Sequence, residues 1–389
     1  MLHRILENDF VQRLTHFPAV GLLGPRQAGK TTLVHAIQNQ LSRPTVYFDL
    51  ERSSDLARFQ QDRTFFLEQF TEETVILDEI HRLPELFPDL RGLIDRNRQP
   101  GRFILLGSAS PTLLRNTSES LAGRISYLEL TPFQLRELPS PDYQQHWLRG
   151  GFPTSWLAPS TDLSAIWRED FIRNYIERDL PQLGLTANPI QLLRLFTMLA
   201  NQQGGLLNQT ALGNALQLRT PLVGQYLNFL EQAFLVRRLT PYATNVGKRL
   251  TKSPKLYIRD SGLVHQLLRL YDINVLFGHP VVGASWEGYV IEQLIPMLQF
   301  DQLPFFYRTA DGAELDLVIE SQGQIKLAVE IKLSDAPTLS KGTTTALQDV
   351  GNPPLLVVTP SADTYRLREH VWVCSVSSLP DMLQRLLDG

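Results

Sequence analysis

A glycine-rich segment near the N-terminus has the residue types and spacing of a phosphate-binding loop. Residues 24 to 31 fit the pattern Gly-x4-Gly-Lys-[Ser/Thr] at every fixed position. Such a loop wraps backbone N–H groups around phosphate oxygens, and its glycines avoid a Cβ clash with the anion. We expect Lys30 to reach the β- and γ-phosphates and Thr31 to ligate Mg²⁺. The predicted nucleotide-binding residues are Gly24, Pro25, Arg26, Gln27, Ala28, Gly29, Lys30, Thr31 and Thr32.

Polar residues that follow two later apolar runs indicate that the site hydrolyses the nucleotide as well as binding it. Asp78 and Glu79 follow the run 75–77, where Asp78 would lie beside Mg²⁺ and Glu79 would polarise the attacking water. Ser108, after the run 103–107, is expected to contact the γ-phosphate. Alone, an acidic pair is an ordinary strand exit and a serine is a turn residue. Together with a complete loop they predict nucleotide hydrolysis, with Glu79 and Lys30 as catalytic residues.

A second set of charged residues lies in the last third of the chain. It comprises Glu287, Asp316, Glu330 and Lys332, and the last two are separated by Ile331. Residues two apart on a strand share a face, so the Glu330 and Lys332 side chains would point the same way. The three carboxylates would form a Mg²⁺ site and Lys332 would stabilise charge during phosphodiester hydrolysis. The alternative is the solvated face of an ordinary strand.

The elements that position the loop are those of an α/β domain. Between residues 18 and 130, short apolar runs alternate with helical patterns, which predicts a mainly parallel sheet. Runs such as 75–77 are apolar on both faces, as expected when helices cover both sides of a sheet. The expected strands are 19–23, 45–49, 75–78, 103–107 and 126–130.

The remaining chain is expected to form two further domains. A composition break at residues 139–142 ends the first, so we predict domains at 1–140, 141–280 and 281–389. The middle one should contain three helices, an apolar strand and a returning strand, which is the order of a winged helix. These five elements are expected at 188–199, 210–218, 220–234, 234–236 and 255–258. The last one should be a second α/β unit, with a helix at 286–298 and strands at 304–308, 314–320 and 325–333.

Basic residues collect after the third helix of the middle domain. They are Arg237, Arg238, Lys248, Arg249, Lys252, Lys255 and Arg259. A basic hairpin of this kind would contact DNA phosphates. The alternative is that this domain packs against the first one and organises subunits.

Composition fits a folded protein and narrows its environment. The chain has 389 residues, of which 43% are hydrophobic and 20% charged, and its net charge of −3 excludes a general polycation. Its one cysteine, Cys374, cannot form an internal disulfide. No apolar run reaches the ~18–20 residues of a membrane span. Because acidic residues follow closely on the N-terminus, we expect a cytoplasmic location.

Five motifs together resemble a known family. They are Gly-Pro-Arg-Gln-x-Gly-Lys-Thr, Leu-Asp-Glu-Ile-His, Gly-Ser-x-Ser, Ser-Leu-Ala-Gly-Arg-Ile and Gly-Gly-Phe-Pro. Over nearly its whole length the chain resembles prokaryotic AAA+-like ATPases with a C-terminal domain of unknown function. The resemblance implies ATP as the nucleotide and a core of the additional-strand, catalytic-glutamate class. It also implies a C-terminal domain similar to restriction-endonuclease-like nucleases.

Such ATPases commonly complete their sites with an arginine from a neighbouring subunit. Arg124 and Arg178 are the two options, and we favour Arg124 because it lies within the ATPase domain. Arg26 could equally be structural. A trans-acting arginine predicts a homo-oligomer.

Two functions agree with these predictions. The first is an ATP-driven motor or remodeller on DNA that carries a nuclease-like module, and branched DNA is one candidate substrate. The alternative is a nucleotide-switched regulator of a partner protein, in which the nuclease-like domain is an inactive scaffold. A small-molecule kinase fits less well, because no acceptor-site signature accompanies the loop.

Overall fold

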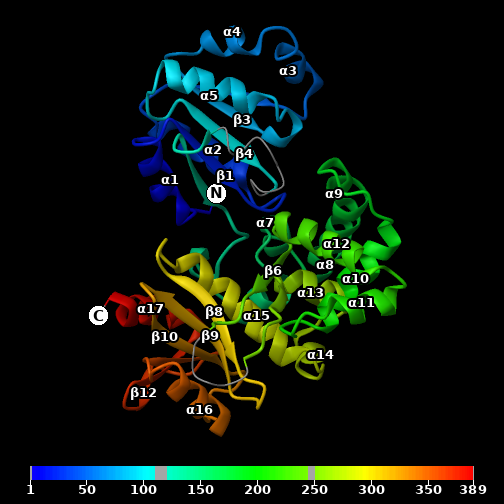
Figure 1. Cartoon of the computed structure of the whole chain (residues 1–389), viewed down its shortest axis with the longest axis vertical. Coiled ribbons are helices and arrows are strands. Elements are labelled where there is room, and N and C mark those ends of the chain that lie inside the picture. The colour runs from blue at the N-terminus through cyan, green and yellow to red at the C-terminus, as the bar shows by residue number, and fades with distance from the viewer. Residues whose placement is uncertain (1, 110–120, 244–249, 389) are drawn as a thin grey trace. The chain divides into compact units, whose positions relative to one another are not determined.

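The computed structural model describes residues 2–109, 121–243 and 250–388 and divides into two compact units (Figure 1). Unit 1 comprises Met1–Phe133, Asp179–Leu185 and Gln232–Phe234, and unit 2 comprises the rest. Four residues named in the sequence analysis or contained in its motifs lie outside the described residues, namely Ser110, Ser120, Lys248 and Arg249. The division into three domains stays a prediction.

Unit 1 is built on a five-stranded parallel sheet, which confirms the predicted parallel sheet of the N-terminal domain. Its strands are β1 (Ala19–Leu23), β2 (Thr45–Asp49), β3 (Thr74–Asp78), β4 (Phe103–Gly107) and β5 (Ile125–Glu129). Their order is β2-β3-β4-β1-β5, so β4 lies between β1 and β3. Three strands have the predicted bounds, whereas β3 and β5 each begin one residue earlier.

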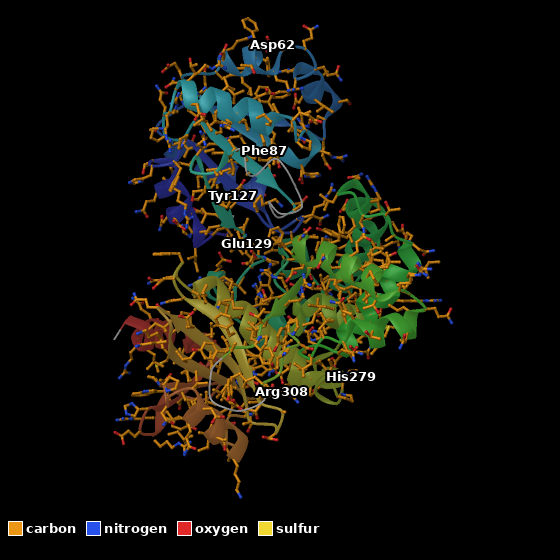
Figure 2. The ribbon with its side chains drawn as sticks, in the orientation of Figure 1. Asp62, Phe87, Tyr127, Glu129, His279 and Arg308 are labelled. Carbon is orange, nitrogen blue, oxygen red and sulfur yellow. The ribbon has the colours of Figure 1, made fainter. Side chains whose placement is uncertain are left out.

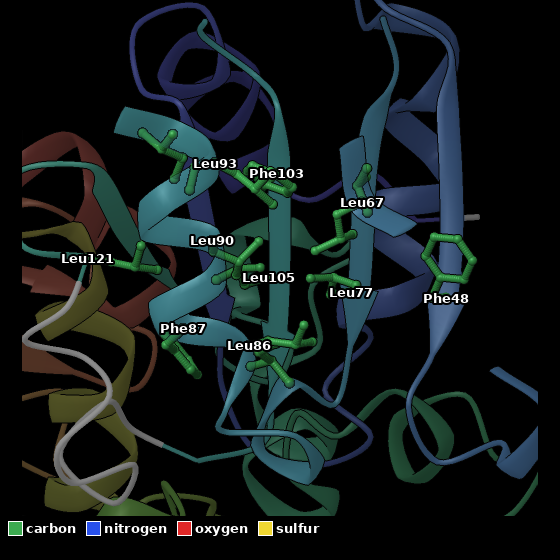
Figure 3. Close-up of a cluster of buried hydrophobic side chains, with 14 of the residues drawn as sticks. Phe48, Leu67, Leu77, Leu86, Phe87, Leu90, Leu93, Phe103, Leu105 and Leu121 are labelled. Carbon is green, nitrogen blue, oxygen red and sulfur yellow. The ribbon is translucent and has the colours of Figure 1, made fainter. Parts of the chain in front are cut away.

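Helices cover both faces of this sheet. They are α1 (Leu6–Leu14), α2 (Lys30–Ile37), α3 (Ser53–Arg58), α4 (Arg63–Glu68) and α5 (Leu86–Arg96). Because side chains alternate along a strand, Ile104 of β4 packs with α1 and α2 residues on one face, while Phe103 and Leu105 pack with α5 on the other (Figure 3). Asp62, labelled in Figure 2, caps α4 by accepting a hydrogen bond from the Phe65 N–H at 2.9 Å.

The first part of unit 2 is mainly helical. Its elements are α6 (Tyr143–Arg149), α7 (Pro153–Trp156), α8 (Thr161–Asn174), a π-helix (Tyr175–Asp179), α10 (Pro189–Asn201), α11 (Gln209–Leu216), α12 (Thr220–Gln232), the antiparallel pair β6 (Val236–Leu239) and β7 (Lys255–Ile258), α13 (Ser261–Leu267) and α14 (Ile273–Phe277). The π-helix leads into α9 (Leu180–Gln182) of unit 1. The expected strand at 234–236 is wrong: Phe234 has φ of 61° and the Leu235 N–H bonds to the Leu230 carbonyl, so β6 begins at Val236.

The second part of unit 2 is a mixed six-stranded sheet with helices. It contains α15 (Val282–Leu294), β8 (Leu303–Arg308), β9 (Glu314–Ser321), β10 (Gln324–Ile331), α16 (Lys341–Asp349), β11 (Leu355–Thr359), β12 (Tyr365–Arg368), β13 (Val371–Ser375) and α17 (Leu379–Asp388), in the sheet order β12-β13-β11-β10-β9-β8. The expected helix at 286–298 is wrong in its bounds. It begins at Val282 and gives way at Ile295 to a 3₁₀ turn that contains Pro296.

Membrane-spanning helices are absent from the described part of the chain, where no helix is both long and apolar enough to cross a bilayer.

The packing of α5 predicts which substitution weakens unit 1. Leu90 on α5 is fully buried, so Leu90→Ala should lower the free energy of unfolding by about 2–5 kcal/mol through the cavity it leaves. Phe65 on α4 is 63% exposed, and Phe65→Ala should stay within about 0.5 kcal/mol of the wild type. Urea unfolding curves measure both changes. Equal effects of the two substitutions would contradict this account of the core.

Candidate functional site

The predicted phosphate-binding loop lies between β1 and α2. Gly24 is required there, because a Cβ at this position would lie 2.2 Å from the Leu130 carbonyl oxygen. Gly29, with φ of 98°, supplies the left-handed residue that ends the loop, and Lys30 begins α2 directly after it. The free N–H groups of the first turn of α2 therefore face the loop, where they favour an anion.

Lys30 is turned inward against the loop itself. Its side chain is buried, and Nζ donates hydrogen bonds to the carbonyl oxygens of Gly24 at 2.9 Å and Pro25 at 3.0 Å. Burial lowers the pKa of Lys30, and the charges of Glu79 and Asp78 oppose that shift. The ammonium thus has only neutral acceptors in the loop, and phosphate oxygens would be stronger partners for it.

The Asp78 carboxylate joins the loop to the neighbouring strands. Its Oδ2 accepts hydrogen bonds from Thr31 Oγ1 at 2.6 Å and from the Tyr47 hydroxyl at 2.7 Å. Burial raises the pKa of Asp78, against the two hydrogen bonds. A threonine hydroxyl beside a carboxylate is an oxygen donor set that suits Mg²⁺. Tyr47 was missed by the sequence analysis, because a tyrosine within a strand is ordinary core.

Glu79 is held in an unusual backbone conformation. Its φ of 52° places a non-glycine residue in the left-handed region, as is often seen at functional sites. Oε2 accepts a hydrogen bond from Ser108 Oγ at 3.1 Å and lies 3.1 Å from His81 Nδ1. Burial opposes ionisation, yet His81, Lys30 and Ser108 together lower the pKa of this carboxyl group to about 2.

The sheet order explains why these side chains meet. β3 and β4 are parallel neighbours, so Glu79 after β3 and Ser108 after β4 emerge at the same edge. β1 borders β4 on its other side and delivers the phosphate loop to that edge. The structure therefore brings together Lys30, Thr31, Asp78, Glu79 and Ser108 from segments that are far apart in sequence, and their roles stay predictions. His81 was missed as a site residue, although the Leu-Asp-Glu-Ile-His motif contained it.

Arg26 of the loop makes contacts that the sequence analysis did not foresee. Its guanidinium lies 2.6 Å from Asp179 Oδ1 and 3.4 Å from Glu51 Oε2. Glu51 also pairs with Arg82, which donates a hydrogen bond to Gln182 at 2.9 Å. These contacts hold the Asp179–Leu185 segment of unit 1 against the phosphate loop, although Asp179 lies 153 residues after Arg26 in the sequence.

The arginines proposed to act on a neighbouring subunit differ in their surroundings. Arg124 forms a bidentate ion pair with Asp95 of its own chain, at 2.6 and 2.9 Å. Arg178 is exposed at the end of the π-helix. Arg124 would have to leave Asp95 before it could act in trans, and its role stays a prediction.

The predicted C-terminal residues meet in unit 2 along β9 and β10. Lys332 donates a hydrogen bond to Glu330 Oε1 at 2.6 Å, and the Ile331 N–H donates to Asp316 Oδ2 at 2.8 Å. Thr343 also bonds Glu330 Oε1, whereas the buried Oε2 has no hydrogen-bond partner. Burial raises the pKa of Glu330, and Lys332 opposes that shift.

A lysine from the middle of the chain forms ion pairs with carboxylates of this region. Lys255 Nζ lies 2.8 Å from Glu287 Oε1, 2.7 Å from Glu314 Oε1 and 3.9 Å from Asp316 Oδ1. Lys255 is buried, which corrects its assignment to a DNA-contacting surface. Within the described residues, no group of three or more His, Cys, Asp or Glu side chains is arranged to hold a metal ion. The expected Mg²⁺ ligands Glu287 and Asp316 face an ammonium group instead.

Most of the other predicted DNA-contacting cations are also paired internally. Arg237 and Arg259 bond the buried Glu292, with Nη2 of the first at 2.9 Å and Nε of the second at 3.0 Å from Oε2. Arg238 Nε donates to Glu231 at 2.7 Å. Of the five described members of the basic set, these three and Lys255 have internal partners, while Lys252 is exposed.

The fold and this site define an ATPase domain of the AAA type: the family model described as "AAA domain" matches residues 16–139. Two domains of unknown function match later parts of the chain, DUF8612 at residues 140–273 and DUF4143 at 282–379. The chain belongs to the family of the uncharacterized proteins Rv2008c of Mycobacterium tuberculosis and Mb2031c of Mycobacterium bovis. Each is 42% identical over 354 residues, which is 91% of this chain and 79% of the relative.

Solved structures show a partial likeness to parts of the chain. The Walker-type ATPase PABY2304 of Pyrococcus abyssi has a TM-score of 0.47 and 16% identity over 69% of this chain and 96% of its own. DnaA of Aquifex aeolicus bound to AMPPCP has a TM-score of 0.31 and 12% identity over 58% of this chain and 86% of its own. Likenesses of this extent carry no argument about function.

The surroundings of Glu79 predict how ATP turnover depends on pH. A carboxylate with a pKa of about 2 stays ionised as the pH falls, so Glu79 should cause no loss of turnover between about pH 5 and pH 8. The His81 side chain favours the ionised form of Glu79. The substitution His81→Ala should therefore raise the pKa of Glu79. The loss of turnover that follows protonation of Glu79 lies below about pH 5 in the wild type and should move to higher pH in this variant.

Normalised pH profiles of turnover measure this shift. Ser108→Ala is the matched control, because it removes a weaker contact with the same carboxylate and should shift this loss of turnover less. A His81→Ala profile that superimposes on the wild type would show that His81 does not hold Glu79 ionised.

Proposed function

We propose that the chain is a Mg²⁺-dependent ATPase in which Glu79 polarises the attacking water. The observation that carries this proposal is the position of the Glu79 carboxylate, which accepts a hydrogen bond from Ser108 at the same sheet edge as Asp78 and the phosphate loop. Lys30 would bind the β- and γ-phosphates, with the backbone of residues 24–32 around them. Thr31 and Asp78 would hold Mg²⁺, which would neutralise negative charge on the phosphates.

We further infer that hydrolysis serves as a conformational switch. Arg26 lies in the loop that would contact phosphates, and its ion pair with Asp179 ties that loop to the Asp179–Leu185 segment. This segment is continuous at both ends with unit 2, through Arg178 and Thr186. A change in the loop on nucleotide binding or hydrolysis would therefore displace the Asp179–Leu185 segment, which leads directly into unit 2.

DNA is the second candidate, as the substrate on which the ATPase acts. The order α10, α11, α12, β6 and β7 is that of a winged helix, and Lys252 is exposed between the two strands. The internal ion pairs of Arg237, Arg238 and Arg259 weaken this candidate, because paired cations release fewer counterions on DNA.

A nuclease role for Glu330 and Lys332 is less well supported. Lys255 occupies the centre of the carboxylate cluster, where a metal-assisted reaction would need a divalent ion. We therefore favour the scaffold interpretation of the nuclease-like region.

Self-assembly and a cytoplasmic location complete the proposal. An arginine supplied in trans, Arg124 or Arg178, would stabilise charge on the γ-phosphate and would need a homo-oligomer.

Two substitutions separate binding from hydrolysis. Lys30→Ala should abolish ATP binding, whereas Glu79→Gln should retain binding but lower turnover by about 10²–10⁴-fold, because the amide cannot accept a proton. Glu72→Gln, at an exposed glutamate of the same unit, is the matched control and should behave as wild type. Equilibrium binding of a fluorescent ATP analogue and steady-state phosphate release measure the two effects. Full turnover in Glu79→Gln would refute the proposed role of this residue.

DNA is tested with the same proteins. Turnover and fluorescence anisotropy are measured with duplex, single-stranded and junction DNA over a range of salt concentrations. Stimulated turnover together with salt-sensitive binding would favour the DNA motor. No salt-sensitive binding to any of the three would eliminate DNA and leave the nucleotide switch.

A further inference from the structure

Lys255 is a buried lysine with three carboxylate neighbours. It begins β7 and is only 3% exposed, and burying an ammonium group is costly unless opposite charges surround it. Glu287 comes from α15, whereas Glu314 and Asp316 share one face of β9. Three carboxylates therefore converge on one cation from two elements.

Other groups complete the surroundings of this ammonium. The Tyr257 hydroxyl donates to the same Glu287 oxygen, and the Phe306 ring lies 5.6 Å from Lys255 Nζ. Arg308, which Figure 2 labels, lies 3.2 Å from Glu314 at a more exposed position. With all three carboxylates ionised, Lys255 and Arg308 leave one net negative charge. Without Lys255 the net charge of the cluster would be −2. Burial and the charges of Glu287 and Glu330 raise the pKa of Asp316, whereas the charge of Lys255 lowers it.

The distances show what else the carboxylates could hold. The two shortest ammonium–oxygen distances are 2.7 and 2.8 Å. Calcium–oxygen distances are about 2.3–2.6 Å and magnesium–oxygen distances about 2.0–2.1 Å. At Glu314 and Glu287, calcium would need only a small contraction and magnesium a larger one. Asp316 Oδ1 is 3.9 Å from the ammonium, so this carboxylate would have to move inward by more than about 1 Å to bind either ion. Nearby, Glu330 Oε2 is buried without a hydrogen-bond partner, so the region has unused acceptor capacity.

We propose that the ammonium of Lys255 is the resident cation of this cluster and excludes divalent ions from it. Replacing Lys255 with a neutral residue creates a divalent-cation site of calcium size, formed by Glu287, Glu314 and Asp316. The site differs from the Mg²⁺ set expected from the sequence, because Glu314 enters it and Glu330 does not. The proposal does not depend on what ATP hydrolysis is for.

Calcium titration of the nucleotide-free full chain by calorimetry tests the proposal. Wild type should show no saturable Ca²⁺ binding at this cluster, and Lys255→Arg, which keeps the cation, should match it. Lys255→Met should bind one Ca²⁺ per chain, and adding Asp316→Asn should abolish that binding. The Asp316→Asn comparison also separates this site from any Ca²⁺ bound at the phosphate loop.

Thermal unfolding provides the second measurement. Lys255→Met leaves buried carboxylates uncompensated and should lower the unfolding midpoint by on the order of 10 °C, which Ca²⁺ should partly restore. Lys255→Met with Glu287→Gln removes one charge of each sign. This double variant should be more stable than Lys255→Met alone, and it keeps the proposal testable if the single variant does not fold.

Three results would overturn the proposal. One is a Ca²⁺ ion bound by wild type and lost in Asp316→Asn. Another is a folded Lys255→Met that binds no Ca²⁺. The third is a double variant no more stable than Lys255→Met, because the cluster would then not be held by charge balance.

Discussion

The parallel arrangement of β1, β4 and β3 is the constraint on which the ATPase site depends. The three strands are hydrogen-bonded neighbours, so their carboxyl ends lie at one edge of the sheet. The phosphate loop follows β1, Ser108 follows β4, and Asp78 with Glu79 closes β3. Moving β4 to another position in the sheet would separate Ser108 from Glu79. The buried runs of these strands are what hold that order, because both faces are covered by helices.

Unit 2 uses its charges in a different way. Glu292, Glu287 and Glu314 are paired with cations from β6, β7, β8 and the residue after β7. Such partly buried pairs are strongly destabilising to break but give little net stability over a well-packed apolar core. Their effect is to fix which strand face meets which helix. Four of the five described basic residues between 237 and 259 are thus engaged in ion pairs within unit 2.

Local patterns predicted the parts of the structure that depend on neighbouring residues. The phosphate loop is contiguous, and β1, β2 and β4 have the expected bounds because each is a short apolar run. Contacts between distant segments were not predictable in the same way. Tyr47 at Asp78, Asp179 at Arg26 and Lys255 at Glu287 depend on the order of strands and helices in space. The start of β6 was missed because the left-handed Phe234 lies within an apolar run that reads as strand.

The position of Lys255 also has a consequence for how the chain acquires its structure. Glu287 follows Lys255 by 32 residues, and Glu314 and Asp316 follow later still. As the chain emerges from the ribosome, Lys255 is therefore made well before any of the carboxylates that neutralise it. Until they arrive, water is its best partner, and burying the Lys255 end of β7 is costly. A fragment that stopped after α14 would contain the lysine and none of these three counter-charges. The ion pairs of Lys255 thus link the two parts of unit 2, even though separate family models match them.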